Sequence, residues 1–285
     1  MSAAAAPTAA PAPYHQGMQT LPRAITLDLD DTLWPFAPIG ARIERVLDDW
    51  LRTHSPRTAE RFPIPAMRAL RDRVFVDHPH LLHDMSALRR RTLQIAFAES
   101  DEPETLVDAA YAVFFAERNR VEWYPDALQA LERLSARLPV FALTNGNADL
   151  AAIGVDHLFV GQLGAREHGA AKPDAGIFLA ACAQLGCAPH EVLHVGDHIE
   201  MDVLGAARAG LRTVWVHRED QRAHRPDWPH ADIAPDLIVH ELAALADRID
   251  ALHDALHDPL RTAHSDTSSR AHADAGDARP TETPP

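Results

Sequence analysis

The 285-residue sequence has very little cysteine and no long uninterrupted apolar segment. Its two cysteines, Cys182 and Cys187, are too few for the disulfide framework of a small secreted domain, and they suit a reducing cytosol. No apolar run approaches the roughly 20 residues that a membrane-spanning helix needs. The Ala- and Pro-rich N-terminus also lacks the charged start and the large apolar run of a secretory signal. We therefore expect a cytoplasmic protein with no membrane partner.

Positive charge is also scarce, because 27 Lys and Arg stand against 41 Asp and Glu and give a net charge of -14. Polyanions are usually bound through basic patches, so this balance argues against nucleic acid as a partner. With 46% hydrophobic and 24% charged residues, the chain has enough apolar material for a core, which excludes disorder throughout. The sequence does not indicate an oligomeric state.

Short apolar runs recur along the chain and mostly alternate with segments of helical period, which is typical of a parallel sheet built from strand-helix-strand units. The runs lack polar alternation, as expected when helices cover both faces of the sheet. The pattern predicts an α/β fold with a Rossmann-like doubly wound parallel sheet. The expected strands are Ala24 to Leu27, Val140 to Leu143, Val192 to Val195, Thr213 to Val216 and Leu237 to Val239.

One long segment interrupts this alternation. Residues 35–120 contain no strand candidate and show only helical periods, which predicts an inserted all-helical cap of about four helices. The α/β core would then be discontinuous, formed by residues 21–34 and 121–258. Residues 1–20 and 259–285 are rich in small and polar residues or proline, so we expect a disordered leader and a disordered tail.

Three carboxylates follow the first expected strand directly. Ala24 to Leu27 runs into Asp28, Asp30 and Asp31, with Thr32 next, and the carboxyl end of a strand is where open α/β sheets bind ligands. Acidic residues have low strand propensity, and a turn after Asp28 would aim both Asp28 and Asp30 at one reacting atom. The alternative is a loop or helix cap with incidental acidic residues.

A second strand end carries groups suited to a phosphate. Thr144, Asn145 and Gly146 follow the strand at Val140 to Leu143, and they offer a hydroxyl, a carboxamide and an accessible backbone N–H. By itself such a turn is usually only a strand end.

Two later segments add a lysine and a second acidic cluster. Lys172 stands just before an expected helix, where a lone lysine is ordinarily solvated. Asp197 and Asp202 follow the strand at Val192 to Val195, although Asp202 also suits a helix cap.

Taken together in this order, the four segments resemble the haloacid dehalogenase superfamily of phosphohydrolases. The resemblance spans about residues 24–240, and an insertion after the first strand matches the members of that superfamily with a helical cap. The residues that carry it are Asp28, Asp30, Thr32, Thr144, Lys172, Gly196, Asp197 and Asp202.

The resemblance implies a mechanism for two of the carboxylates. Asp28 would be the nucleophile that attacks phosphorus and forms an aspartyl phosphate. Asp30 would protonate the leaving oxygen and then activate water, and a neighbouring anionic Asp28 favours the protonated form that this role needs.

The resemblance also implies a cation, because a phosphate dianion would otherwise be repelled by so many acidic groups. Oxygen ligands alone point to Mg²⁺, held by the carboxylates of Asp28 and Asp197 and by the backbone carbonyl of Asp30. Asp202 would support Lys172 or the metal from behind. The residues expected to hold the phosphoryl group are Thr144, Asn145, Gly146 and Lys172.

The cap would select the leaving group, a small phosphorylated metabolite. Trp34, just after the nucleophile, and Arg89 and Arg91 in the cap are the candidate contacts, although the ring of Trp34 could instead pack the cap hinge. Segments around His83-Asp84 and at Thr144 and Asp197 resemble bacterial flavin-mononucleotide phosphatases, which also act on 5-amino-6-(5-phospho-D-ribitylamino)uracil.

Three alternatives stay open. A nucleotide or sugar phosphatase of the same capped group is the nearest of them. A haloacid dehalogenase is disfavoured because it needs neither the second carboxylate, Asp30, nor a metal, and the chain keeps both Asp30 and Asp197. A non-catalytic interaction protein on this fold would be expected to lose Asp28, Asp30 or Lys172, and none is lost.

Overall fold

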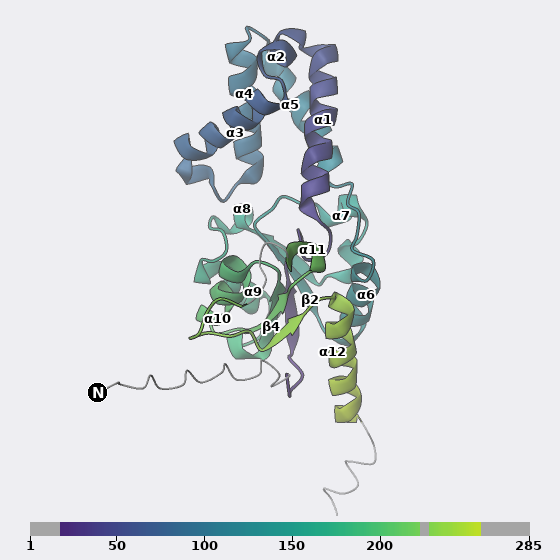
Figure 1. The fold of residues 1–285 in the computed structure, drawn as a ribbon. Coiled ribbons are helices and arrows are strands. Elements are labelled where there is room, and N and C mark those ends of the chain that lie inside the picture. Colours follow the sequence, from purple (N-terminus) through teal and green to yellow (C-terminus); the bar gives the residue numbers. More distant parts are fainter. Residues whose placement is uncertain (1–17, 223–227, 258–285) are drawn as a thin grey trace, which may run out of the picture.

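The computed structural model describes residues 18–222 and 228–257, which contain a six-stranded parallel sheet and a separate group of helices (Figure 1). The strands run in the order β3-β2-β1-β4-β5-β6, and every neighbouring pair is parallel. The doubly wound α/β class expected from the sequence is therefore confirmed. The strands are β1 (Ala24–Leu27), β2 (Val140–Thr144), β3 (Gly161–Gly164), β4 (Val192–Gly196), β5 (Arg212–Val216) and β6 (Leu237–Val239).

The apolar pattern did not predict β3. Its four residues contain two glycines and the exposed Gln162, because it lies at the edge of the sheet beside β2 and is only partly covered. Gly161 has a packing reason, since a Cβ there would lie 2.7 Å from an atom of the Phe141 ring. An edge strand of this kind has no continuous apolar run to reveal it.

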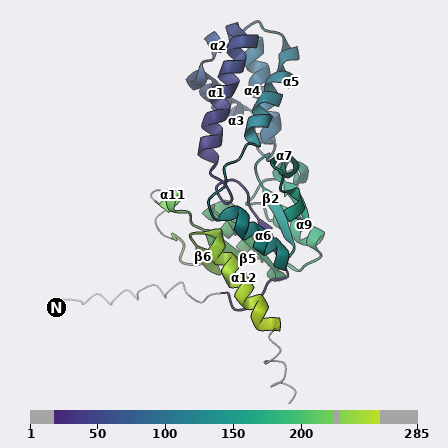
Figure 2. The same cartoon turned by 90° about the vertical axis from the view of Figure 1, so that its right-hand side faces the viewer.

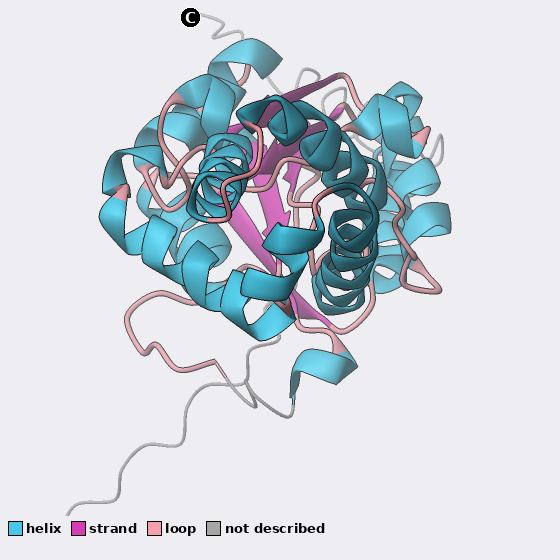
Figure 3. Ribbon diagram, turned by 90° about the horizontal axis from the view of Figure 1, so that it is seen from above, coloured by secondary structure: helices cyan, strands magenta, loops and turns pink. Residues whose placement is uncertain are grey.

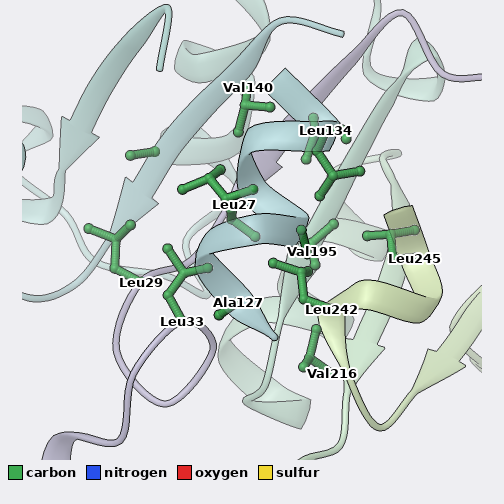
Figure 4. Close-up of a cluster of buried hydrophobic side chains, with 14 of the residues drawn as sticks. Leu27, Leu29, Leu33, Ala127, Leu134, Val140, Val195, Val216, Leu242 and Leu245 are labelled. Carbon is green, nitrogen blue, oxygen red and sulfur yellow. The ribbon is translucent and has the colours of Figure 1, made fainter. Parts of the chain in front are cut away.

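One face of the sheet is covered by α6 (Ala127–Arg137) and α12 (Leu242–His257), which also pack on each other. Ile25 and Leu27 of β1 enter this layer, and Figure 4 shows side chains of the central strands meeting those of the two helices. Most of these side chains are less than 5% exposed. Packing in this layer fixes the position of β1 in the core, and therefore also the position of the residues that follow its carboxyl end.

The opposite face is covered mainly by α9 (Ala175–Leu185), whose Ile177 and Phe178 pack against Phe141 and Leu143 of β2. Neighbouring residues of β2 therefore point into different layers, as the two-residue repeat of a strand requires. Seen from above, helices surround the strands (Figure 3). The other helical segments of the core are α7 (Leu150–Ile153), α8 (Ala165–His168), α10 (Gly205–Arg208), α11 (Glu219–Arg222), the 3₁₀ turns η3 (Asp156–Leu158) and η4 (Pro189–Glu191), and the π-helical η5 (Ile199–Leu204).

The helices between β1 and α6, residues 36–118, stand away from the sheet beyond the strand ends (Figures 1 and 2). There are five α-helices where the periodicity suggested four, because a six-residue helix begins at Pro56 directly after the first one. The cap helices are α1 (Phe36–His54), α2 (Pro56–Arg61), α3 (Ile64–Asp77), α4 (Met85–Glu99) and α5 (Val107–Arg118), with 3₁₀ turns η1 (Pro79–Leu81) and η2 (Glu104–Leu106).

The cap has its own apolar cluster, formed by residues from all five helices between Leu47 and Ala110. Its base is continuous with the core, because Ile39 and Ile43 of α1 and Phe114 of α5 belong to the main core cluster. The cap is therefore held to the core by packing where the chain enters it, at the start of α1, and where the chain leaves it, at the end of α5.

Part of the expected leader is ordered. Met18 is 3% exposed and packs into the core, and its carbonyl oxygen accepts a hydrogen bond of 2.8 Å from Nε of Arg248. The expectation of disorder is therefore wrong for this residue, and residues 1–17 lie outside the described part of the chain, as does the expected tail 259–285. Among the helices of residues 18–222 and 228–257, none has the length and apolar character needed to cross a membrane.

Candidate active site

The loops after β1, β2 and β4 meet at the carboxyl edge of the sheet and enclose a cavity of about 160 Å³. Parallel strands end at the same edge, so the segments that the sequence singled out separately are brought together here. The residues that line this cavity are Asp28, Asp30, Asp31, Thr144, Asn145, Gly146, Lys172, Asp197, His198, Met201 and Asp202.

Asp28 continues the line of β1, and the chain turns directly after it. Its backbone N–H donates to the carbonyl of Val195 in β4 at 2.9 Å, and the residue is 8% exposed. The turn is closed by a hydrogen bond from Leu33 N–H to the Leu29 carbonyl and by a left-handed backbone at Asp31, with φ of 59°. The turn therefore returns the chain to the sheet edge and leaves the carboxylate of Asp28 at the cavity wall.

Lys172 is buried against the nucleophile candidate. Its Nζ lies 2.6 Å from Oδ1 of Asp28, 2.6 Å from Oδ1 of Asp202 and 2.9 Å from the carbonyl oxygen of Leu143. These three acceptors use all three ammonium protons, so Lys172 is fixed in position. The ammonium group of Lys172 therefore neutralises the carboxylate of Asp28 directly. The sequence predicted a different contact, with an oxygen of the phosphoryl group.

Asp202 contacts Lys172, and both of its carboxylate oxygens interact with donors of the protein. Oδ1 faces Lys172 and Nε2 of His194, the latter at 3.2 Å, while Oδ2 accepts from the backbone N–H of His198 at 2.9 Å. The π-helical turn η5 carries Asp202 back over Gly196, where a Cβ would lie 2.4 Å from its carboxyl carbon. Gly196 is therefore required by this close approach.

Burial dominates the electrostatics of this group. Burial raises the pKa of Asp28 above its ordinary value, and the nearby Lys172 only partly opposes this. Burial alone would lower the pKa of Lys172, but Asp202 and Asp28 raise it above its ordinary value, so the ammonium stays charged. Asp28 therefore depends on the positive charge of Lys172 to remain ionised.

Asp30 is held by two donors at the other side of the cavity. Nε1 of Trp34 donates to Oδ1 at 2.8 Å, and Nη2 of Arg118 donates to Oδ2 at 2.6 Å. Arg118 is 2% exposed and ends α5, so this ion pair joins the cap to the core. The sequence analysis missed Arg118, because a lone arginine 88 residues from Asp30 carries no motif.

Trp34 does not lie where a substrate contact requires. It is 0% exposed, belongs to the core cluster and meets Trp123 edge to face with ring centroids 5.0 Å apart. The expected role of Trp34 in substrate binding is therefore corrected. Its apolar ring packs in the core, and its one polar atom, Nε1, donates to Asp30.

Thr144, Asn145 and Gly146 line the cavity from the end of β2. Oγ1 of Thr144 accepts from Gly146 N–H at 2.9 Å, which leaves its hydroxyl proton available to another acceptor. The carboxamide of Asn145 instead bonds both backbone groups of Lys172, at 2.7 and 2.9 Å. Asn145 therefore positions the lysine segment, and a Cβ at Gly146 would lie 2.6 Å from Oδ2 of Asp30.

The carboxylates can supply a metal site. Asp28, Asp197 and Asp202 each offer an oxygen within 4.8 Å of the others, and all three are buried. Hydroxyl Oγ1 of Thr32 donates toward Asp28 at 3.5 Å and toward Asp197 at 3.4 Å, so it lies between these two acids. A set of oxygen donors fits Mg²⁺. Both oxygens of Asp202 accept from protein donors, Lys172 and His198, whereas Oδ2 of Asp28 has only the long contact of 3.5 Å with Thr32, so Asp28 suits the ion better than Asp202.

The two cap arginines differ in position. Arg89 lines a second, larger cavity between cap and core, which also touches Asp30, Arg118 and Lys172. Arg91 is exposed and its Nε donates to Nε2 of His78 at 3.2 Å, away from that cavity. The expected substrate contact from Arg91 is therefore corrected, because the helical rotation of α4 directs it outward.

This fold and this arrangement of groups are those of the haloacid dehalogenase-like hydrolases, and the chain belongs to that family. A model of the family, described as haloacid dehalogenase-like hydrolase, matches residues 22–210. The match includes the loops that carry Asp28, Thr144, Lys172 and Asp202.

Similar proteins include enzymes of two chemistries. The chain is 30% identical to the 5-amino-6-(5-phospho-D-ribitylamino)uracil phosphatase YigB of Escherichia coli, over 79% of this chain and 95% of the relative. It is 39% identical to a phosphoserine phosphatase of Thermus thermophilus, over 54% of this chain and 62% of the relative. It also resembles the crystal structure of a 2-haloacid dehalogenase from Pseudomonas syringae, with a TM-score of 0.72 and 32% identity, over 81% of this chain and 99% of that one.

Proposed function

We propose that the chain is a Mg²⁺-dependent phosphatase that hydrolyses small phosphorylated metabolites through a phosphoaspartate at Asp28. The single observation that carries the proposal is that Asp28 and Asp30 line one cavity, while their partners differ. Lys172 neutralises Asp28, and Asp30 is held by Trp34 and Arg118. Two carboxylates in different environments can act as nucleophile and as acid and base.

The reaction has two displacements at phosphorus. The Asp28 carboxylate attacks phosphorus, the ester P–O bond breaks, and the leaving oxygen takes a proton from Asp30. Asp30 then takes a proton from water, whose oxygen attacks phosphorus and releases inorganic phosphate and the free carboxylate of Asp28. Lys172 holds Asp28 in place throughout, and the Thr144 hydroxyl is available to donate to a phosphoryl oxygen.

Asp28, Asp197 and the backbone carbonyl of Asp30 would hold Mg²⁺, as the cluster of buried carboxylates favours. When bound, the ion would offset the negative charge of the phosphoryl group and of the acidic cavity.

A haloacid dehalogenase is the second candidate, because the chain resembles the Pseudomonas syringae enzyme over most of its length. A halide leaves as an anion and needs no proton, so that reaction has no use for a carboxylic acid beside the nucleophile. A phosphate ester of an alcohol releases a poor leaving group unless it is protonated. The placement of Asp30 at the cavity therefore favours the phosphatase.

For the substrate, we propose flavin mononucleotide or 5-amino-6-(5-phospho-D-ribitylamino)uracil, with nucleotide and sugar phosphates as the alternative. The likeness to YigB supports this, as does a cap cavity of about 650 Å³, which accommodates a leaving group of that size. The net charge of -14 argues against nucleic acid as a partner, and the free thiols Cys182 and Cys187 suit the cytoplasm.

Hydrolysis of p-nitrophenyl phosphate, flavin mononucleotide and a panel of phosphorylated metabolites tests this function, with 2-chloropropionate as the dehalogenase substrate. We expect phosphate release that stops in chelator and returns with Mg²⁺, and none in Asp28→Asn. Asp197→Asn should raise the Mg²⁺ concentration needed for half activity at least roughly 10-fold, whereas Asp247→Asn on the exposed side of α12 should not. Chloride release that persists in chelator would instead support the dehalogenase.

A further inference from the structure

The cavity between cap and core, of about 650 Å³, has a largely apolar wall and three cap arginines, Arg71, Arg89 and Arg118. Arg71 and Arg118 have carboxylate partners. The cap contributes three phenylalanines from different helices, α1, α3 and α5, and the catalytic end carries Asp30 and Lys172. The lining residues are Asp30, Phe36, Arg71, Phe75, Leu82, Met85, Arg89, Phe114, Arg118, Asn145, Gly146, Asn147, Ala171, Lys172 and Met201.

Arg89 differs from the other arginines of its helix. Arg90 pairs with Asp108 and lies over the ring of Tyr111, and Arg91 donates to His78. Among residues 18–222 and 228–257, Arg89 has neither a hydrogen-bond acceptor nor an ion-pair partner, and its guanidinium carbon lies 4.6 Å from the ring centroid of Phe114. Its five N–H donors are therefore unused at a cavity wall.

The charges around Arg89 do not form an anion cradle. Burial and the repulsion of Arg71 together lower the pKa of Arg89 to about 10, although Glu44 partly opposes them. Arg71 also has acidic neighbours of its own, with Asp72 at 3.2 Å and Glu44 at 3.7 Å. Moving a second anion into an apolar cavity is costly, whereas carbonyl oxygens need only donors.

We propose that Arg89 is a specificity residue which donates, through its planar fork, to carbonyl oxygens at the far edge of a flat ring in the leaving group. Phe75 and Phe114 pack against that ring, and the phosphate end reaches Asp28. The substrate class is thus a phosphate monoester with a large, neutral, carbonyl-bearing heterocycle, such as an imide ring. This inference rests on the proposed phosphatase function, because that function places the phosphate at Asp28 and therefore the leaving group toward Arg89.

Two substitutions at Arg89 distinguish binding of a carbonyl oxygen of the substrate from binding of a second anionic group. Arg89→Leu keeps packing on Phe114 and removes all donors, whereas Arg89→Lys keeps the charge and removes the fork. We expect kcat/KM for flavin mononucleotide to fall roughly 10 to 100-fold in Arg89→Leu and nearly as far in Arg89→Lys. Hydrolysis of p-nitrophenyl phosphate, which is too small to reach Arg89, should stay within about 3-fold of the wild type.

The matched control is Arg90→Leu, the same change one residue along α4, on a side chain that pairs outside the cavity. It should leave the ratio of the two kcat/KM values unchanged. Equal losses on both substrates in Arg89→Leu would overturn the proposal, since Arg89 would then only support the cap. The proposal would also be overturned, in favour of a second anion site, by two results together. These are an unchanged kcat/KM for flavin mononucleotide in Arg89→Lys and a preference of the wild-type enzyme for a carboxylate-bearing phosphate such as phosphoglycolate.

A binding measurement keeps this test apart from the test of the phosphatase function. Riboflavin carries the ring but no phosphate, and its fluorescence can report binding to the Asp28→Asn protein without turnover. We expect Arg89→Leu in that background to weaken riboflavin binding roughly 10-fold or more, with Arg90→Leu unchanged. Unchanged riboflavin binding would overturn the role of Arg89, whereas absent hydrolysis of p-nitrophenyl phosphate by the wild type would overturn only the phosphatase function.

Discussion

Arg118, the last residue of the last cap helix, donates a hydrogen bond from Nη2 to Oδ2 of Asp30 at 2.6 Å. Its Nε also donates to Oδ1 of Asn147 at 3.2 Å, and its guanidinium lies 5.3 Å from the ring centroid of Phe36. Both groups of the ion pair are largely buried. The cap therefore does more than cover the cavity, because one of its residues orients a carboxylate of the core.

Replacing Arg118 should damage the chemistry more than the binding. Arg118→Met would leave Asp30 held by Trp34 alone, so we expect kcat for p-nitrophenyl phosphate to fall roughly 10 to 100-fold with KM nearly unchanged. Arg120→Met is the matched control, because Arg120 lies two residues further and its side chain is 69% exposed. A normal kcat in Arg118→Met, measured with a normal melting temperature, would mean that the ion pair has no part in orienting Asp30.

Trp34 should affect all substrates alike. Trp34→Phe retains most of the packing against Trp123 and removes the N–H that donates to Oδ1 of Asp30. We expect equal losses of roughly 3 to 30-fold in kcat/KM on flavin mononucleotide and on p-nitrophenyl phosphate, because the ring lies in the core. A loss confined to flavin mononucleotide would contradict this and would restore Trp34 as a substrate contact.

Gly146 is constrained by the groups around Asp30. A Cβ at this position would lie 2.6 Å from Oδ2 of Asp30 and 3.1 Å from Nη2 of Arg118, so Gly146→Ala must displace one of them. We expect kcat to fall at least roughly 10-fold without loss of fold. Gly40→Ala is the control, because its Cβ would meet only an atom of Phe36 at 3.7 Å, and alanine in a helix is neutral or stabilising by up to about 1 kcal/mol. Full activity of Gly146→Ala would show that Asp30 can move without cost.

Asp202 should matter for stability, and its contribution should depend on pH. Burial alone would raise the pKa of Asp202, but Lys172 and His194 lower it below its ordinary value. Because the pKa is lower in the folded state than the roughly 3.9 of the unfolded chain, the stabilisation is present above that pH and is lost as the pH falls through the folded-state value.

The corresponding variant is Asp202→Asn, which breaks a buried ion pair. Its free energy of unfolding should be about 3 kcal/mol below that of the wild type at pH 7, and denaturant titrations should show this difference shrinking below about pH 4. Asp247→Asn, on an exposed pair, should change stability by less than about 1 kcal/mol. A difference that is the same at pH 7 and pH 3 would show that the charge of Asp202 does not contribute.

The sequence predicted those parts of the molecule that depend on strand ends. Asp28, Thr144 and Asp197 follow buried apolar runs, and parallel strands end at one edge, so their meeting in one cavity follows from topology. Strand β3 was missed because an edge strand with two glycines has no apolar run.

Contacts that depend on how helices rotate and pack against the sheet could not be predicted in the same way. Arg118 reaches Asp30 only because α5 ends beside the first loop, and Arg89 and Arg91 lie two residues apart on α4 but face different sides. Trp34 was assigned to the substrate from its closeness to Asp28 in sequence, whereas the turn after Asp28 sends its ring into the core. Such assignments require the tertiary packing.

The most direct test of the account is the pre-steady-state reaction of Asp30→Asn with p-nitrophenyl phosphate, followed by peptide mapping. Nitrophenolate leaves without protonation, so the first displacement should proceed, while the second lacks the group that activates water. We predict a burst of one nitrophenolate per enzyme, then slow turnover, with a phosphoryl group on the peptide that contains Asp28. Turnover without a burst, or a phosphoryl group on any other residue, would contradict the assignment of Asp28 as the nucleophile and Asp30 as the acid and base.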